Sequence, residues 1–94
     1  DQPVADRLWG PRCALAYNPR VQLDRGVVVV FGSDSPVETF DPLAGIHAAV
    51  TRRRPDGSHG PSGWYPEARL TLDEALHAYT VAPAWVAGQE RHLG

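Results

Sequence analysis

The run VVVVF at residues 27–31 constrains the fold more than any other part of the sequence. β-Branched residues favour extended backbone, and a continuous apolar run is typical of a strand that is buried on both faces. Strands of this kind occur mainly in parallel sheets that helices cover. The sequence therefore predicts an α/β fold that is mostly helical and has one buried, parallel-type strand.

Helix signals lie on both sides of this run. Asp41 followed by Pro42 predicts an N-cap and a first helical residue, and Thr71 with Glu74 forms the pattern of a capping box. Pro83 has no N–H group and is expected to interrupt the last helix. The predicted helices span residues 19–25, 41–53 and 71–87.

The predicted strand has no partner within the sequence. No second stretch has strand character, although the N–H and C=O groups of a buried strand need neighbouring strands. The sequence also contains no methionine, even at position 1. Both observations lead us to expect a fragment of a longer polypeptide, or a homo-oligomer that pairs through the unpaired strand.

Charge and cysteine content exclude several function classes. The formal net charge is -2, so we expect neither nucleic acid nor an anionic membrane as a partner. No apolar run approaches the roughly 18 residues that a membrane-spanning helix needs. Cys13 is the single cysteine, which excludes an internal disulfide and a thiolate zinc cluster and favours a cytoplasmic setting.

Asp34 is the main candidate for a functional residue. It follows Gly32 and Ser33 at the C-terminal end of the predicted strand, where parallel α/β folds place their ligands and catalytic groups. The alternative is that its carboxylate caps backbone amides in the Ser-Asp-Ser-Pro turn. Position in the sequence alone leaves both interpretations open.

A resemblance to a known family favours the first interpretation. The stretches GVVVVFGSDSPVETFDPLAGIHAAVTRR and GWYPEARLTLDEALHAYTVAPAW resemble the C-terminal part of the amidohydrolase superfamily, in the branch called amidohydrolase family 3. The preceding LWGPRCALAYNPRVQLDRG is similar to the segment before that family's last barrel strand. The resemblance implies that residues 1–94 are a C-terminal segment of a (β/α)8 TIM barrel, whose last strand covers about residues 27–32.

The resemblance also implies a chemistry. It indicates a metal-dependent hydrolase that acts on C–N bonds of an amide-like small molecule, with a divalent metal, expected to be zinc. Asp34 matches the aspartate that serves as metal ligand and proton shuttle in that family. The family's other ligands, which include a His-x-His pair and a lysine or carboxylate, are absent from the sequence. We therefore expect the 94-residue chain alone to bind no metal and to be inactive.

A second hypothesis is a small, non-enzymatic α/β module that binds a partner or associates with itself. Other residues with chemical potential have simpler explanations. His47 is expected to pack on the apolar face of its helix, and Glu74 and His77 to lie on a solvated surface. Arg52, with the two arginines that follow it, is explained by the helix dipole. Trp64 is expected to pack within the fold.

Overall fold

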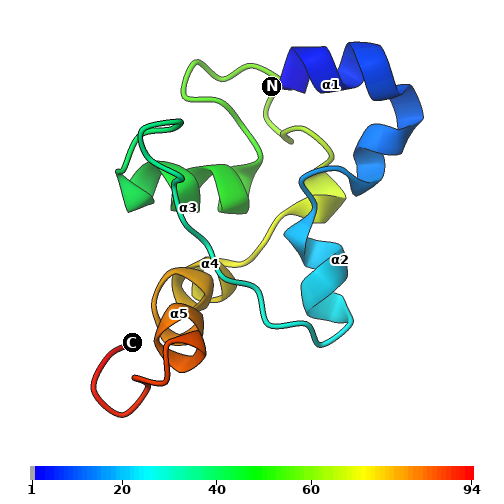
Figure 1. Ribbon diagram of the computed structural model, residues 1–94. Helices are drawn as coiled ribbons and strands as arrows, with labels where there is room; N and C mark the ends of the chain where they lie inside the picture. The colour runs from blue at the N-terminus through cyan, green and yellow to red at the C-terminus, as the bar shows by residue number, and fades with distance from the viewer. Residues whose placement is uncertain (1) are drawn as a thin grey trace.

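Every regular element that the structure describes is helical. A computed structural model describes residues 2–94, and Figure 1 shows their helices joined by long connections, without a sheet. In chain order the elements are α1 (Gln2–Trp9), η1 (Gly10–Leu15), α2 (Pro19–Asp24), α3 (Pro42–Thr51), η2 (Pro66–Ala68), α4 (Leu72–Tyr79) and α5 (Val81–Val86). Within residues 2–94, no helix has the length and apolar character needed to cross a bilayer.

The prediction of an α/β fold with one buried strand, as a TIM-barrel segment, is wrong for this structure. Residues 27–31 are extended but belong to no strand. The N–H of Val27 donates to the Gln22 carbonyl at 3.1 Å, and the N–H of Phe31 donates to the Ala78 carbonyl at 2.9 Å. Both bonds tie the segment to helical residues, and a strand requires a neighbouring extended segment, which residues 2–94 do not supply.

The predicted helix starts are confirmed. The Asp41 carboxylate accepts from the N–H of Leu43 at 2.9 Å, and Pro42 follows as the first residue of α3. In α4, the Thr71 hydroxyl accepts from the N–H of Glu74, and the Glu74 carboxylate accepts from the N–H of Thr71. These reciprocal bonds satisfy amides that a helix start leaves without partners.

The helix ends differ from the prediction. α3 stops before residue 53 because Arg52 has φ 55°, in the left-handed region. The expected interruption of the helix at 71–87 does occur, but it lies at Thr80, which has φ -123° and ψ -71°, and not at Pro83 itself. Pro83 explains the position of this break, since a proline ring collides with the carbonyl four residues earlier, here that of Tyr79.

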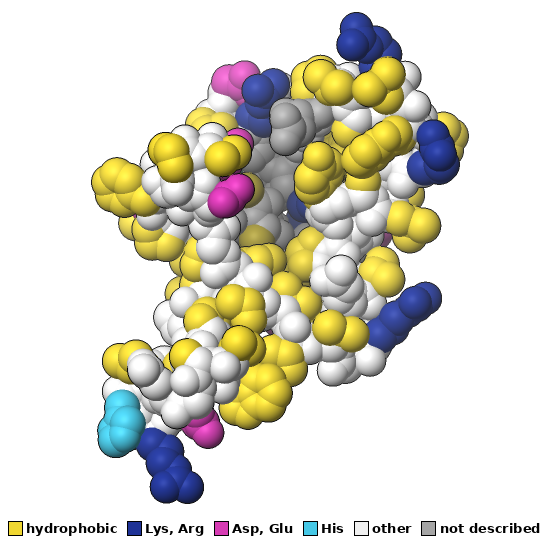
Figure 2. Space-filling view, viewed as in Figure 1, with side chains coloured by type: hydrophobic (Ala, Val, Ile, Leu, Met, Phe, Trp, Pro, Cys, Tyr) yellow, Lys and Arg dark blue, Asp and Glu magenta, His cyan; other side chains and the backbone are white. Residues whose placement is uncertain are grey.

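The helices contact one another mainly through small residues. Six alanines are buried, and the larger buried side chains are few; the buried apolar residues are Ala5, Cys13, Trp64, Ala68, Leu70, Ala75, Ala78, Ala82 and Ala84. Many larger apolar side chains lie outside, and Figure 2 shows them spread over the visible surface. Leu43, the first apolar residue of α3, is 70% exposed. The structure thus has a thin core for its length.

The Tyr79 side chain of α4 packs directly against Gly45 of α3. A Cβ atom at this position would collide with the hydroxyl of Tyr79, so only glycine allows the two helices to lie this close. The N–H of Leu70, just before α4, donates to the Ala49 carbonyl at 3.0 Å. These contacts fix α4 against α3.

We predict that Gly45→Ala destabilises the fold. The added methyl group forces Tyr79 to move, which costs about 1–3 kcal/mol, against a gain of up to about 1 kcal/mol in helix propensity. Urea unfolding should show a lower midpoint with an unchanged slope. Gly32→Ala is the matched control, because no atom lies within 4 Å of its Cβ position. Equal stability of the two variants would contradict this packing, and Tyr79→Phe should partly restore the Gly45→Ala variant.

Candidate functional site

Asp34 lies in a turn directly after the extended segment. Its backbone has φ 53°, a left-handed conformation that aspartate tolerates better than most residues. The Asp34 carbonyl accepts from the N–H of Val37 at 2.9 Å, and the Ser33 hydroxyl accepts from the N–H of Ser35 at 3.2 Å. The turn is therefore held by a main-chain carbonyl and a serine hydroxyl.

The carboxylate of Asp34 has no hydrogen-bond partner among residues 2–94, and the residue is exposed. Capping of the turn by this carboxylate, the simpler interpretation of the sequence, does not occur in the structure. A carboxylate that performs no local structural task is free to accept a proton or to bind a cation. This is the observation that keeps Asp34 the leading candidate.

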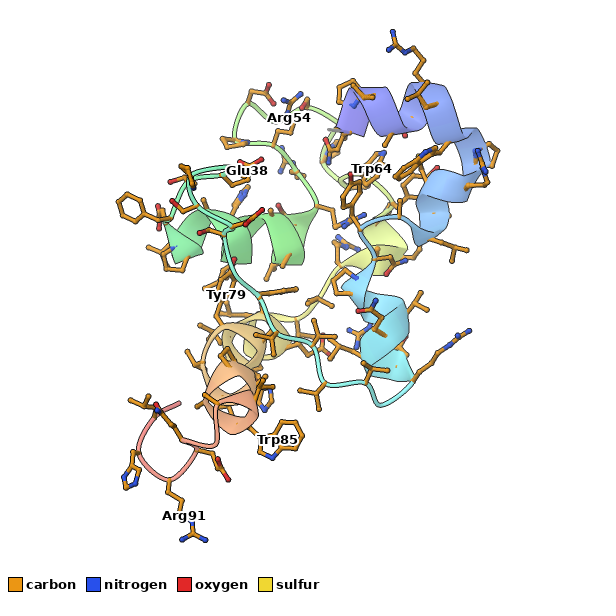
Figure 3. The ribbon with its side chains drawn as sticks, in the orientation of Figure 1. Glu38, Arg54, Trp64, Tyr79, Trp85 and Arg91 are labelled. Atoms are coloured by element: carbon orange, nitrogen blue, oxygen red, sulfur yellow. The ribbon has the colours of Figure 1, made fainter. Side chains whose placement is uncertain are left out.

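A polar pocket of about 430 Å³ lies next to this turn. Carboxylate and guanidinium groups line it together. Its wall includes Gly32, Ser33, Glu38, Thr39, Asp41, Arg53, Arg54 and Tyr79. Figure 3 shows Glu38 on the turn and Arg54 on the loop that follows α3, both above that helix. Side chains of both signs can orient a polar substrate by its charges or dipoles.

A second pocket, of about 510 Å³, has more apolar residues in its wall. Val29, Val30 and Phe31 form part of its wall, together with Tyr79 of α4 and Ala48 of α3. The two pockets share Gly32, Gly45, Ala48 and Tyr79. The segment that leads to Asp34 therefore lines one pocket along its length, and the turn that follows it lines the other pocket.

The residues that the structure describes do not form a metal site. No group of three or more His, Cys, Asp or Glu side chains within residues 2–94 is arranged to hold an ion. A catalytic zinc usually has three protein ligands. Asp34 by itself offers a single carboxylate, which is fewer ligands than such an ion needs.

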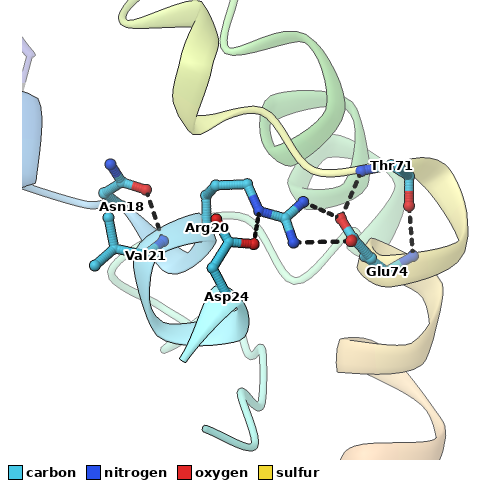
Figure 4. Close-up of polar contacts among 6 residues, drawn as sticks. All are labelled: Asn18, Arg20, Val21, Asp24, Thr71 and Glu74. Atoms are coloured by element: carbon cyan, nitrogen blue, oxygen red, sulfur yellow. Dashed lines mark hydrogen bonds and ion pairs between the residues drawn. The ribbon is translucent and has the colours of Figure 1, made fainter. Parts of the chain in front are cut away.

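An ion pair between α2 and α4 fixes the start of the extended segment. The Arg20 guanidinium donates to both carboxylate oxygens of Glu74, at 2.5 and 2.8 Å, and to Asp24 at 2.9 Å. Figure 4 shows that the same Glu74 carboxylate also accepts from the N–H of Thr71. The hydrogen bonds from Arg20, which have the largest effect, and the bond from the N–H of Thr71 lower the pKa of the Glu74 carboxyl from its ordinary 4.5 to about 2.

The end of the segment is fixed against α4. Phe31 donates its N–H to the Ala78 carbonyl, and its ring meets that of Tyr79 edge-on at a centroid distance of 5.4 Å. Arg20–Glu74 and Phe31–Tyr79 thus hold the two ends of one connection, from α2 to the turn of Asp34. Sequence reasoning missed both contacts because their partners lie far apart along the chain.

Arg52 has a structural role that the helix dipole does not describe. Its guanidinium donates to the Tyr17 carbonyl at 2.6 Å and to the Trp64 carbonyl at 3.1 Å, and lies 5.0 Å from the Trp64 ring centroid. Burial lowers the pKa of the guanidinium. Trp64 itself is buried, as expected, and donates its indole N–H to Asp6 at 3.0 Å. Arg52 therefore joins three segments of the chain.

The remaining candidates lie apart from the Asp34 turn. His47 is exposed, so the prediction that it packs is wrong. His77 is exposed as expected, whereas Glu74 is partly buried by its contact with Arg20. Cys13 is fully buried, as is common for a free cysteine, and burial raises the pKa of its thiol.

We predict an acid-sensitive contribution from Glu74 to stability. Its pKa is lower in the folded chain than in the unfolded chain, so the contribution is complete above about pH 4.5 and is lost as pH falls towards about 2. Because the pair is partly exposed and screened by solvent, Glu74→Gln should cost about 1 kcal/mol at pH 7. Urea unfolding from pH 7 to pH 3 measures both effects.

Asp73→Asn is the matched control for this prediction. Asp73 also lies in the first turn of α4, so its loss removes the same interaction with the helix dipole and leaves the Arg20 contact in place. The Glu74→Gln variant should show a flatter dependence of stability on pH than wild type. An equal loss of stability in both variants would show that the effect comes from the helix dipole, and it would contradict the role of the ion pair.

Comparisons with known proteins match this chain along almost its whole length. The family model described as "Amidohydrolase family" matches residues 2–94. The chain is 36% identical over 92 residues to "Putative amidohydrolase YtcJ" of Bacillus subtilis (strain 168) and, over the same length, to "Protein LONG AFTER FAR-RED 3" of Arabidopsis thaliana. It is 37% identical over 75 residues to "N-substituted formamide deformylase" of Arthrobacter pascens.

The relatives are much longer than the chain. The matched regions cover 97%, 97% and 80% of this chain, but 17%, 15% and 13% of the respective relatives. No solved structure matches the chain.

Proposed function

The chain belongs to the amidohydrolase family, and we propose that it contributes Asp34 to the hydrolysis of a C–N bond in an amide-like small molecule. Relatives whose printed names are amidohydrolase and formamide deformylase support a hydrolase of C–N bonds. The observation that carries the role of Asp34 is its exposed carboxylate, which no described residue engages. Its position beside a polar pocket supports the same role.

Asp34 would act as general base and then as general acid. In the first step the ionised carboxylate accepts a proton from the water molecule whose oxygen forms a bond to the substrate's carbonyl carbon. In the second step it donates that proton to the nitrogen of the leaving amine as the C–N bond breaks. The carboxylate returns to its ionised state, so the two steps balance in protons.

The metal that the family resemblance implies does not fit residues 2–94 by themselves, since they offer one suitable carboxylate and no cluster of three ligands. When bound, a divalent ion of this kind, here proposed to be zinc, polarises a carbonyl group and acidifies water. We assign Asp34 as one of its ligands and assign no step to the metal. The other ligands would come from polypeptide outside the 94 residues.

Catalysis therefore requires more polypeptide than this chain. The chain spans about a sixth of the length of the first relative that it matches. A hydrolytic site needs a base, a group that stabilises the developing oxyanion, and contacts that orient the substrate. Residues 2–94 offer the first of these at Asp34, and we propose that the 94-residue chain alone is inactive.

The first activity test uses the longer hydrolase polypeptide that carries this segment. We predict that Asp34→Asn lowers kcat by about 10²–10⁴-fold, because the amide keeps the shape of the carboxylate and cannot accept the proton. An N-substituted formamide is the first substrate to assay, since one relative carries that name. Amine release measures turnover.

Glu38→Gln is the matched control for this assay. Glu38 is exposed and lines the neighbouring pocket, so the variant removes a nearby negative charge and leaves Asp34 intact. We expect it to change kcat much less than Asp34→Asn does. Full activity of Asp34→Asn, with its folding confirmed by circular dichroism, would remove Asp34 from the mechanism.

A further inference from the structure

The position of the Asp34 carboxylate depends on the main chain that carries it. No residue within 2–94 donates a hydrogen bond to this carboxylate, so its place is set by the turn and by the contacts that hold the two flanks of the turn. A general base must lie within hydrogen-bond reach of the proton that it accepts. A displacement of about 1 Å at such a group can lower the rate about 100-fold.

The flank before the turn rests on the last turn of α4. Phe31, which comes shortly before Asp34, donates its N–H to the Ala78 carbonyl at 2.9 Å. In a continuous helix this carbonyl would accept from the N–H of Ala82. The helix breaks at Thr80 instead, which leaves the carbonyl to Phe31.

Tyr79 connects this flank to the flank after the turn. Its ring meets the Phe31 ring edge-on, with centroids 5.4 Å apart and planes at 62°, which is a favourable geometry for an aromatic pair. Its hydroxyl, and the ring carbon that carries the hydroxyl, pack against Gly45 of α3, the helix that follows the turn. Figure 3 shows Tyr79 in the space between α3 and α4. One half-buried side chain thus contacts the chain on both sides of Asp34.

We infer that Tyr79 is a positioning residue for Asp34. Its ring keeps the two flanks of the turn at a fixed separation and so holds the carboxylate in place. The inference rests on the proposed role of Asp34 as the general base. The ring suits this task because it is rigid and reaches both flanks, whereas a smaller side chain would leave a gap between Phe31 and Gly45. The ring, and not the hydroxyl, is the part that positioning requires.

Direct contact of the Tyr79 hydroxyl with a substrate is the competing role. Tyr79 lines both pockets, and a phenol can donate or accept a hydrogen bond. The two roles differ in the part of the side chain that they require. Substrate contact requires the hydroxyl and positioning requires the ring, so Tyr79→Phe and Tyr79→Leu separate them.

The experiment measures steady-state kinetics of the longer hydrolase polypeptide that carries this segment. Tyr79→Leu should lower kcat about 10–100-fold and leave KM nearly unchanged, because a displaced base affects only the chemical step. Tyr79→Phe should keep most of the activity. An equal loss in both variants would assign the effect to the hydroxyl and overturn the inference. Trp85→Leu is the matched control, since it removes an aromatic ring that is 57% exposed on α5, and it should leave kcat unchanged.

A double substitution tests whether Tyr79 acts through Asp34. In the Asp34→Asn background, Tyr79→Leu should cause little further loss of kcat, because the base that Tyr79 positions is already gone. A loss as large as in the wild-type background would show that Tyr79 acts on the fold or the substrate directly, which contradicts the inference. Gly45→Ala moves the ring from its other side and replaces Tyr79→Leu if that variant fails to fold. It should lower kcat, and adding Tyr79→Phe should restore kcat in part; wild-type kcat in Gly45→Ala would equally contradict the positioning role.

Amide hydrogen exchange separates a failure of this inference from a failure of the proposed function. The N–H groups of Phe31 and Val37 form bonds before and within the turn, and Tyr79→Leu should speed their exchange, measured by mass spectrometry of the peptides that contain them. If Asp34→Asn keeps full activity, the proposed function fails, and the exchange of these amides still decides whether Tyr79 holds the turn. If Asp34→Asn is inactive while Tyr79→Leu changes neither kcat nor exchange, the positioning role alone fails.

Discussion

Close contact through alanine and glycine is the constraint on which the other features of this fold depend. Small residues allow short helices to lie near one another, as α3 and α4 do at Gly45, but they remove little apolar surface from water. The larger apolar side chains, including Leu43 and Val28, are left outside. A chain built in this way has an ordered arrangement of helices but leaves many large apolar side chains exposed to water.

The specific polar contacts compensate in part for the thin core. Arg20 and Glu74, which lie far apart in the sequence, connect α2 to α4, and Arg52 connects the end of α3 to two loops. Each partly exposed contact of this kind contributes modestly to stability. Their larger effect is on geometry: Arg20–Glu74 fixes the start of the connection that leads to the turn of Asp34, and Arg52 fixes the end of α3 against the loops of Tyr17 and Trp64.

The sequence predicted what is decided locally. Asp41 and the Thr71–Glu74 pair cap their helices because the required side chain lies within a few residues of the amide that it serves. Burial of Cys13 also followed from residue type. The position of Asp34 at the end of an extended segment was expected as well, although its catalytic role stays a prediction.

The features that the sequence did not predict depend on contacts between distant residues. The valine run satisfies the rules for a buried strand, but a strand forms only where a neighbour is present, and the described residues provide none. His47 lies on a helix face that no other element covers, so periodicity alone placed it wrongly inside. The Arg20–Glu74 contact has no local signature at all. In each case the sequence did not show which other part of the chain contacts the residue.

The break at Thr80 has a consequence for how the fold opens. It divides the C-terminal helical region into α4 and α5, each too short to be stable without tertiary contacts. α4 is held by Arg20, Leu70 and the Tyr79 contact, whereas α5 buries only Ala82 and Ala84. α5 and the tail therefore form a separate unit of low local stability, which can unfold and refold while the turn that carries Asp34 keeps its shape.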